Sequence, residues 1–201
     1  GGVVCTSSNA EATLRWAWER GEQILFLPDQ HLGRNTAYKM DVPLAQMVVW
    51  DPAEPLGGIT PEALRTARMI LWNGHCSVHT RFNVKQIEYL RRTKPAVRII
   101  VHPECTWDVV QAADDVGSTE HIIRQVTGSS PGSIWAIGTE VHLVNRLAET
   151  LAPERRDACV RALVNLALVT GNVGKASAGL YPLYPGANEQ GSKDVGCVPD
   201  Y

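Results

Sequence analysis

Four residues that can bind a metal or transfer protons lie in two short segments of the sequence. Cys76 and His79 are three residues apart, and His102 and Glu104 stand together in a later segment. Zinc takes thiolate, imidazole and carboxylate ligands, so these four side chains form a candidate zinc site. The chain has no HExxH pattern and no CxxC pair, so the spacing alone leaves the metal undecided.

The cysteine spacing also bears on an iron–sulfur cluster. Clusters need thiolates, usually in tight spacing, whereas the nearest pair, Cys76 and Cys105, lies 29 residues apart. An odd count without a CxxC pair favours reduced, cytosolic thiols over a disulfide framework. The five cysteines are Cys5, Cys76, Cys105, Cys159 and Cys197.

Two hydroxyl-rich turns form a second kind of candidate site. Residues 6–9 and 117–119 each precede a predicted helix. Free N–H groups and hydroxyls at a helix start bind carboxylates or phosphates well. Ordinary N-capping explains the same residues, and the sequence does not decide between the two.

The elements that position these residues are short apolar segments alternating with helical patterns. The segments are continuous and partly β-branched, which is typical of buried strands in a parallel sheet. The predicted strands are Ile24–Leu27, Met47–Trp50, Met69–Trp72, Val97–Val101 and Ile134–Ile137. The predicted helices are Glu11–Arg20, one opening at Thr60, Val84–Arg92, Trp107–Ala113, Glu120–Val126, Val141–Leu151 and Asp157–Val169. This alternation predicts an α/β layered fold with right-handed crossovers.

Polar residues directly follow four of the predicted strands, at 28–31, 73–79, 102–105 and 138–140. In open α/β sheets, ligands bind beyond the carboxyl ends of the strands. We therefore expect the four segments to line one cavity. Strand ends are also polar wherever they simply meet solvent, and that explanation stays open.

Composition excludes several classes of function. The 201 residues are 44% hydrophobic, and 19 Lys and Arg stand against 21 Asp and Glu, for a net charge of -2. A general nucleic-acid binder is excluded because no basic excess is available to neutralise phosphates. The sequence has no apolar run near the roughly 18 residues of a membrane span, and its first residues lack the basic start of a secretory signal. A cytoplasmic protein is therefore expected.

Several motifs in order resemble one family. They are the segments CTSSNA (5–10), FLPDQHLGR (26–34), LWNGHCSVH (71–79), VHPEC (101–105), DVGST (115–119) and GTEV (138–141). On these motifs, residues 1–149 resemble quinolinate synthase, an iron–sulfur transferase of NAD biosynthesis. The resemblance implies three similar αβα domains with parallel sheets around a pseudo-threefold axis, of which this chain would hold the second and part of the third.

The resemblance also implies the chemistry. The family condenses iminoaspartate with dihydroxyacetone phosphate to give quinolinate, and L-aspartate oxidase is its pathway neighbour. A 4Fe–4S cluster is held by one cysteine from each domain, and its open iron acts as a Lewis acid in the dehydration steps. No nucleic acid and no membrane are expected as partners.

The resemblance assigns roles to seven residues of this chain. Cys76 matches a cluster ligand, and His79 matches a histidine that contacts substrate. His102 and Glu104 match the HPE motif, in which the glutamate does acid–base work. Hydroxyls that bind substrate carboxylate or phosphate groups are matched by Ser7, Ser118 and Thr119. Cys5 and Cys105 match positions that are not ligands and are interpreted as structural thiols.

The chain departs from the family in ways that predict a truncated protein. The other two cluster cysteines and the Tyr-x-Asn motif expected before Gly1 are missing, and neither Cys159 nor Cys197 has the expected Cys-Pro context. We expect domains at 1–120 and 121–150 and a separate tail at 151–201. This truncation, together with a tail that does not resemble quinolinate synthase, predicts a chain that is inactive alone.

The tail resembles another family, the molybdopterin oxidoreductases, which include formate dehydrogenase and the NADH:quinone oxidoreductase large subunit. Gly171, Gly174 and Gly179 suit the turns of a loop near the pterin, and Asn188 and Gln190 suit polar cofactor contacts. An unrelated glycine-rich loop is the alternative. We expect the junction near 150–154 to be an assembly artefact. Two other functions stay open: a fragment of a molybdopterin-dependent oxidoreductase, and a non-catalytic α/β remnant.

Overall fold

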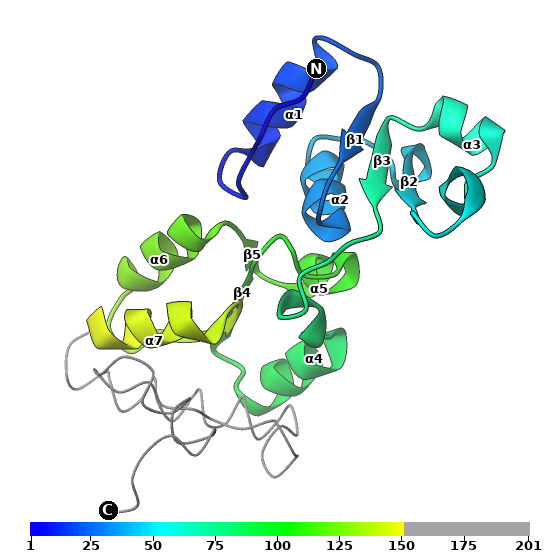
Figure 1. Ribbon diagram of the computed structural model, residues 1–201. Coiled ribbons are helices and arrows are strands. Elements are labelled where there is room, and N and C mark those ends of the chain that lie inside the picture. Colours follow the sequence, from blue (N-terminus) through cyan, green and yellow to red (C-terminus); the bar gives the residue numbers. More distant parts are fainter. Residues whose placement is uncertain (151–201) are drawn as a thin grey trace, which may run out of the picture. The chain divides into compact units, whose positions relative to one another are not determined.

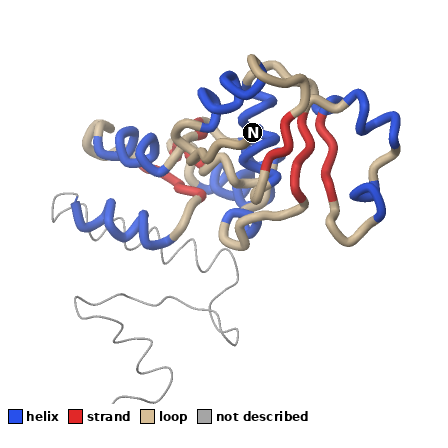
Figure 2. The backbone as a smooth tube through the Cα atoms, turned by 45° about the horizontal axis from the view of Figure 1, so that its top comes forward, coloured by secondary structure: helices blue, strands red, loops and turns tan. Residues whose placement is uncertain are grey.

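The fold was analysed in a computed structural model, which describes residues 1–150 of the chain. Two parallel sheets of three strands each are built from these residues (Figures 1 and 2). The first has the strand order β1-β3-β2 and the second the order β5-β4-β6. The strands are β1 (Ile24–Phe26), β2 (Met47–Trp50), β3 (Met69–Trp72), β4 (Val97–Val101), β5 (Asp115–Val116) and β6 (Ile134–Gly138).

Helices connect the strands, as parallel pairing requires. The α-helices are α1 (Ala10–Trp18), α2 (Gln30–Lys39), α3 (Pro61–Thr66), α4 (Val84–Thr93), α5 (Trp107–Ala112), α6 (Thr119–Thr127) and α7 (Val141–Thr150). Short 3-10 turns occur at Leu44–Gln46, Pro55–Gly58 and His79–Arg81. The predicted α/β fold with parallel sheets between helices is confirmed.

The first sheet is held by an apolar core beneath α1 and α2. Leu14 of α1 and Met69 and Leu71 of β3 are almost fully buried in it. Helix α2 lies close to β3 because Gly33 faces the sheet: a Cβ at this position would come within 2.7 Å of side-chain carbons of Leu71 and Phe26. The close packing of α2 fixes where its polar residues stand.

The second sheet has helices on both faces. On one face, Ile99 and Val101 of β4 pack with Val109 of α5 and Ile87 of α4. On the other face, Ile100 packs with residues of α6 and α7. Figure 1 shows α4 and α5 on one side of β4 and α6 and α7 on the other. Because every second side chain of a strand points to the same face, β4 supplies both cores.

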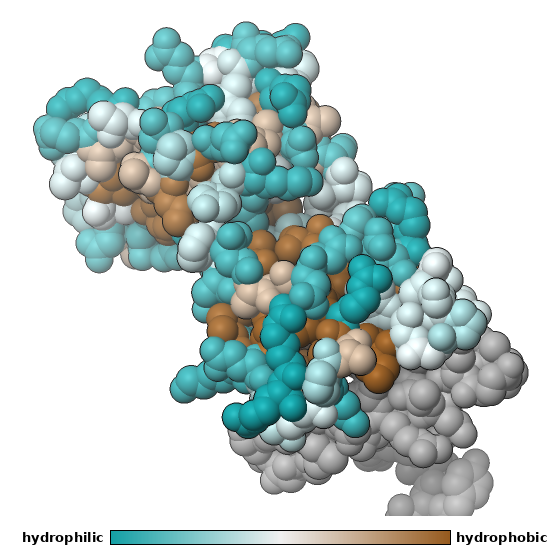
Figure 3. All heavy atoms as spheres, turned by 180° about the vertical axis from the view of Figure 1, so that it is seen from behind, coloured by the Kyte–Doolittle hydropathy of each residue, from teal (hydrophilic) through white to brown (hydrophobic). Residues whose placement is uncertain are grey.

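Some apolar side chains remain at the surface. Leu25, in the edge strand β1, is 54% exposed, and Leu27 just after it is 59% exposed. Figure 3 shows one face of the molecule, where hydrophobic side chains gather in patches bounded by hydrophilic ones. No helix of the described residues is both long and apolar enough to cross a membrane.

Candidate functional site

Asp29 follows β1 and links this end of the first sheet to the loop after β3. Its Oδ1 accepts a hydrogen bond from the Leu32 N–H at 2.7 Å, which caps α2, and its Oδ2 accepts one from the Cys76 N–H at 2.9 Å. The Gln30 N–H also donates to the Gly74 carbonyl at 2.9 Å. These bonds fold the loop after β3 back onto the start of α2 and hold Cys76 there.

His79 lies one turn after Cys76 and is buried. The Thr80 N–H donates to the Cys76 carbonyl at 3.3 Å, so the segment turns like the start of a helix. This turn explains why a three-residue spacing brings the thiol and the imidazole to the same side. The three-residue spacing in the sequence therefore correctly indicated two side chains that can act on the same ligand.

Glu104 reaches the same place from the second sheet. The loop after β4 turns tightly, with the Cys105 N–H donating to the His102 carbonyl at 3.0 Å. Glu104 Oε2 lies 3.0 Å from His79 Nδ1. The thiol of Cys76, a ring nitrogen of His79 and a carboxylate oxygen of Glu104 all lie within 4.8 Å of one another.

Two further contacts extend this group. The rings of His79 and His102 are stacked, with centroids 4.5 Å apart and planes 14° apart. His79 Nε2 lies 3.3 Å from the Thr139 hydroxyl, and His102 Nε2 lies 3.2 Å from the Ser7 hydroxyl. Residues from four segments far apart in the sequence thus meet. Three of them follow β3, β4 and β6, as expected, whereas Ser7 precedes α1; that the segments after the strands line one cavity stays a prediction.

Burial and hydrogen bonding set the charges of this group. The hydrogen bond from His79 lowers the pKa of Glu104, and this outweighs the opposing effect of burial. Burial, assisted by repulsion from His79, lowers the pKa of His102 to about 4, against the attraction of Glu104. At neutral pH the site therefore holds an ionised carboxylate beside a neutral His102. Because the carboxylate can only accept, His79 donates to Glu104 from Nδ1.

The donor set is compatible with both metal centres considered from the sequence. Three of the four predicted zinc ligands, Cys76, His79 and Glu104, form the described metal-binding group. His102 is not part of that group, although its Nδ1 is 4.0 Å from Glu104 Oε2, and its role as a ligand stays a prediction. For a 4Fe–4S cluster, this group supplies one thiolate, which is enough to bind one of the four iron atoms. Zinc chemistry also suits one thiolate, one imidazole and one carboxylate.

The other two cysteines of the described residues have different surroundings. Cys105 is fully buried, and its thiol donates to the Gly138 carbonyl at 3.6 Å. Burial raises the pKa of this thiol to about 12 and also raises the pKa of Cys5. A buried thiol with a raised pKa is a poor metal ligand because metals bind the thiolate. Both observations agree with structural thiols at these positions.

The turn at Ser118 and Thr119 lies apart from these contacts. Ser118 caps α6, its hydroxyl accepting from the His121 N–H at 3.4 Å. His121 Nε2 in turn lies 2.9 Å from Asp115 Oδ2. No hydrogen bond joins this turn to His79 or Glu104 among residues 1–150. Substrate binding by Ser118 and Thr119 stays a prediction, as do the catalytic roles of the other residues.

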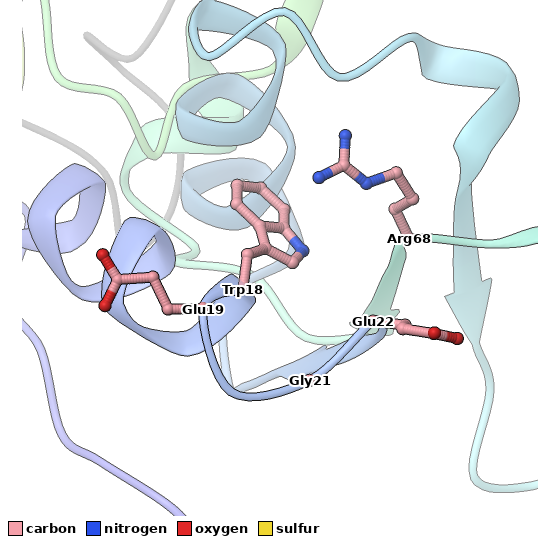
Figure 4. A pocket seen from close by; sticks show the side chains of 5 residues that line it. All are labelled: Trp18, Glu19, Gly21, Glu22 and Arg68. Atoms are coloured by element: carbon pink, nitrogen blue, oxygen red, sulfur yellow. The ribbon is translucent and has the colours of Figure 1, made fainter.

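A surface hollow lies at the opposite edge of the first sheet. Its volume is about 520 Å³, and its lining residues precede β1 and β3 (Figure 4). Arg68 lies over the Trp18 ring, 4.9 Å from its centroid, whereas Glu19 points away. Since ligands of open α/β sheets bind at the carboxyl edge, this hollow is separate from the candidate site.

Comparison with known proteins decides the family. The family model described as "Quinolinate synthetase A protein" matches residues 1–164. The chain belongs to the quinolinate synthase family. It is 56% identical over 153 residues to the quinolinate synthase of Acidobacterium capsulatum, covering 76% of this chain and 41% of that protein. To the quinolinate synthase of Streptomyces coelicolor it is 54% identical over 158 residues, covering 78% and 40%.

The match defines what part of a quinolinate synthase is present. The chain spans about 40% of the length of the curated relatives it matches. The family match includes residues 151–164, which we assigned to the tail, and the predicted domain boundaries stay a prediction. The molybdopterin oxidoreductase resemblance and the junction near 150–154 lie outside the described residues and are also still predictions.

Asn35 is the residue of this site that the sequence did not reveal. It belongs to α2, is buried, and binds the Glu104 loop. Helix α2 itself was not among the predicted helices, so no local signal marked Asn35, and its partners are 68 and 70 residues further along the chain.

Proposed function

We propose that this chain is the part of a quinolinate synthase that carries its acid–base residues and one cluster ligand. The reaction is the condensation of iminoaspartate with dihydroxyacetone phosphate to quinolinate. The observation that supports this most strongly is the convergence of Cys76, His79 and Glu104 within 4.8 Å, in a chain that belongs to the family. The transferase class, cytoplasmic location and L-aspartate oxidase as pathway neighbour belong to the same proposal.

In this proposal Cys76 would be one of the ligands that hold a 4Fe–4S cluster. The Asp29 carboxylate holds the Cys76 backbone, so the thiol is presented at a fixed place. When bound, the cluster supplies Lewis-acid chemistry that polarises substrate oxygens. The remaining steps are derived for the side chains of the chain itself.

Glu104 is the proton acceptor and donor. It is ionised at neutral pH because the hydrogen bond from His79 lowers its pKa, so it begins as the base. After Glu104 takes a proton from substrate, its own carboxyl group, now protonated, can return that proton to a leaving hydroxyl. His79 holds the Oε2 atom of this carboxylate from Nδ1.

His102 is predicted from the sequence as a catalytic residue, and in this proposal it acts together with Ser7 by binding substrate. Neutral His102, with its pKa near 4, shares a hydrogen bond with the Ser7 hydroxyl. Hydroxyl and imidazole N–H groups in such a place bind carboxylate oxygens without adding a full charge. Ser118 and Thr119 are proposed to bind a second anionic group of the substrates.

The test is a chimera in which this chain's residues 1–150 replace the matching segment of the Acidobacterium capsulatum quinolinate synthase. After anaerobic reconstitution, we expect quinolinate formation from iminoaspartate and dihydroxyacetone phosphate. Glu104→Gln should reduce the rate by about 100-fold, the range of a lost general acid–base group. Glu120→Gln, at an exposed position of α6, is the matched control and should leave the rate unchanged.

A chimera that binds its cluster but forms no quinolinate would argue against the proposal. Full activity of the Glu104→Gln chimera would instead favour the non-catalytic α/β remnant. In both cases the quinolinate is measured directly, so cluster content and product formation are separated.

A further inference from the structure

Asn35 makes an unusual pair of hydrogen bonds from the middle of α2. Its side chain is buried, with 6% of the residue exposed. The amide Nδ2 donates to the Pro103 carbonyl and to the Cys105 carbonyl, each at 2.8 Å. Buried amides need partners, and both donors of this one are used on a single loop.

The two carbonyls that Asn35 binds are those on either side of Glu104. One amide thus holds the backbone before and after this residue, which restricts the direction in which its side chain leaves the loop. The same loop is tied by the Cys105 N–H to the His102 carbonyl. These bonds leave Glu104 Oε2 3.0 Å from His79 Nδ1.

Helix α2 is a firm support for this contact. Asp29 caps its first turn, and Gly33 sits against Phe26 and Leu71 so closely that a Cβ would not fit. Asn35 therefore connects the packed first sheet to the loop after β4. Its Oδ1 atom has no hydrogen-bond partner among the described residues, so the donors of Nδ2 account for the polar contacts of this amide.

We propose that Asn35 is a positioning residue that fixes Glu104 against His79 by binding both carbonyls flanking Glu104. Its importance for the reaction rests on the proposed function, whereas the positioning itself rests on the hydrogen bonds alone. Asn35→Leu keeps the size of the side chain and removes both donors. Asn35→Asp places an acceptor opposite two carbonyl oxygens and is expected to act at least as strongly.

The tautomer of His79 is the readout, measured by ¹⁵N NMR of imidazoles in the metal-free 201-residue chain at neutral pH. In the wild type, Nδ1 carries the proton because the Glu104 carboxylate accepts it. We expect both Asn35 variants to shift the ring towards a mixture with the Nε2–H form. A general packing defect would not by itself select this ring.

His121 provides an internal control in the same spectrum. Its Nε2 lies 2.9 Å from Asp115 Oδ2 and its Nδ1 3.1 Å from the Arg124 guanidinium, so it holds the Nε2–H tautomer. A change of His79 with His121 unchanged supports the proposal. If His79 keeps its Nδ1 proton in Asn35→Leu, or if both rings change together, the positioning role is overturned.

Thr36→Val is the matched control variant, since Thr36 is the next buried polar residue of α2 and should alter neither ring. In the chimera, Asn35→Leu should lower kcat about 10-fold with little change in KM. An unchanged kcat beside an altered His79 would overturn the catalytic part of the proposal. An inactive wild-type chimera would count against the proposed function and leave the NMR result standing.

Discussion

His102 shows how burial selects a protonation state. Its ring is stacked on His79 and is 5% exposed, so a positive charge there would lack solvent. Burial therefore destabilises the charged form of the ring, and this lowers the pKa of His102 to about 4. The result is a site with one carboxylate charge and a neutral hydrogen-bonding ring.

The lowered pKa of His102 makes stability depend on pH. In the unfolded chain the ring titrates near its ordinary value of about 6.5, so between there and pH 4 the unfolded state binds a proton that the folded state does not. The free energy of unfolding should therefore fall as pH drops through this window, by about 3 kcal/mol from this residue. Urea unfolding from pH 7 to pH 4 measures it.

The matched variants separate this effect from other titrations. His102→Gln should flatten the curve between pH 6.5 and 4, whereas His142→Gln, at a largely exposed ring, should leave it as in the wild type. Equal slopes for the wild type and His102→Gln would contradict this explanation. The contribution of Glu104 has the usual carboxylate sign: present above its ordinary pKa and lost as pH falls through the lowered value.

The residues of the site were predictable to the extent that their spacing was local. Cys76 and His79 share one turn, and Glu104 follows a strand, so residue type and strand ends were sufficient to propose them. Asn35 was missed because hydrogen bonds to carbonyls about 70 residues away leave no local pattern. His102 was predicted as a zinc ligand because its type fits, but its ring direction towards Ser7 depends on packing.

At the scale of elements, Asp29 does two tasks with one carboxylate. It caps α2 through Leu32 and anchors the loop after β3 through Cys76. Asp29→Asn keeps an oxygen for the cap but replaces the second acceptor with an NH₂ group, which cannot accept from the Cys76 N–H. Asp29→Ala removes both bonds.

We therefore expect a graded loss of stability at this position. A lost cap costs about 1 kcal/mol and a lost hydrogen bond to a charged group about 1.5–3 kcal/mol more, so Asp29→Ala should lose about 2.5–4 kcal/mol and Asp29→Asn about half of that. Thr60→Ala removes a simple cap, the bond from the Ala63 N–H to Thr60 Oγ1, and should cost about 1 kcal/mol. Urea unfolding compares the three; equal losses for Asp29→Ala and Thr60→Ala would show that the Cys76 bond contributes nothing.

The elements themselves were largely predictable, because buried parallel strands are short and continuously apolar. Met47–Trp50, Met69–Trp72 and Val97–Val101 were predicted with the bounds that the structure has. Strand β5 was missed: it is two residues long, and Asp115 with its polar neighbours resembles a turn. It pairs with β4 through Ile100 and Val101, a contact that depends on tertiary structure.

At the scale of the whole molecule, the number of cysteine thiolates decides whether an iron–sulfur cluster can be held. The described metal-binding group contains one cysteine, Cys76, while Cys105 is buried and bonded to the Gly138 carbonyl. The chain spans about 40% of the length of its curated relatives. A cluster with three protein thiolates therefore needs ligands from beyond the described residues.

This predicts the outcome of reconstituting the 201-residue chain alone with iron and sulfide under anaerobic conditions. The described residues offer the cluster one thiolate, and neither Cys159 nor Cys197 has the expected Cys-Pro context. Iron and sulfide should therefore remain far below four per chain after desalting. The chimera with the Acidobacterium capsulatum segments should retain its cluster, and there Cys76→Ser should remove most of it while Cys5→Ser, outside the metal-binding group, should not. Iron and sulfide analysis with visible absorption measures all four proteins. A stable, near-stoichiometric cluster on the chain alone would mean that cysteines outside residues 1–150 join Cys76, because the described part offers no second thiolate to the group.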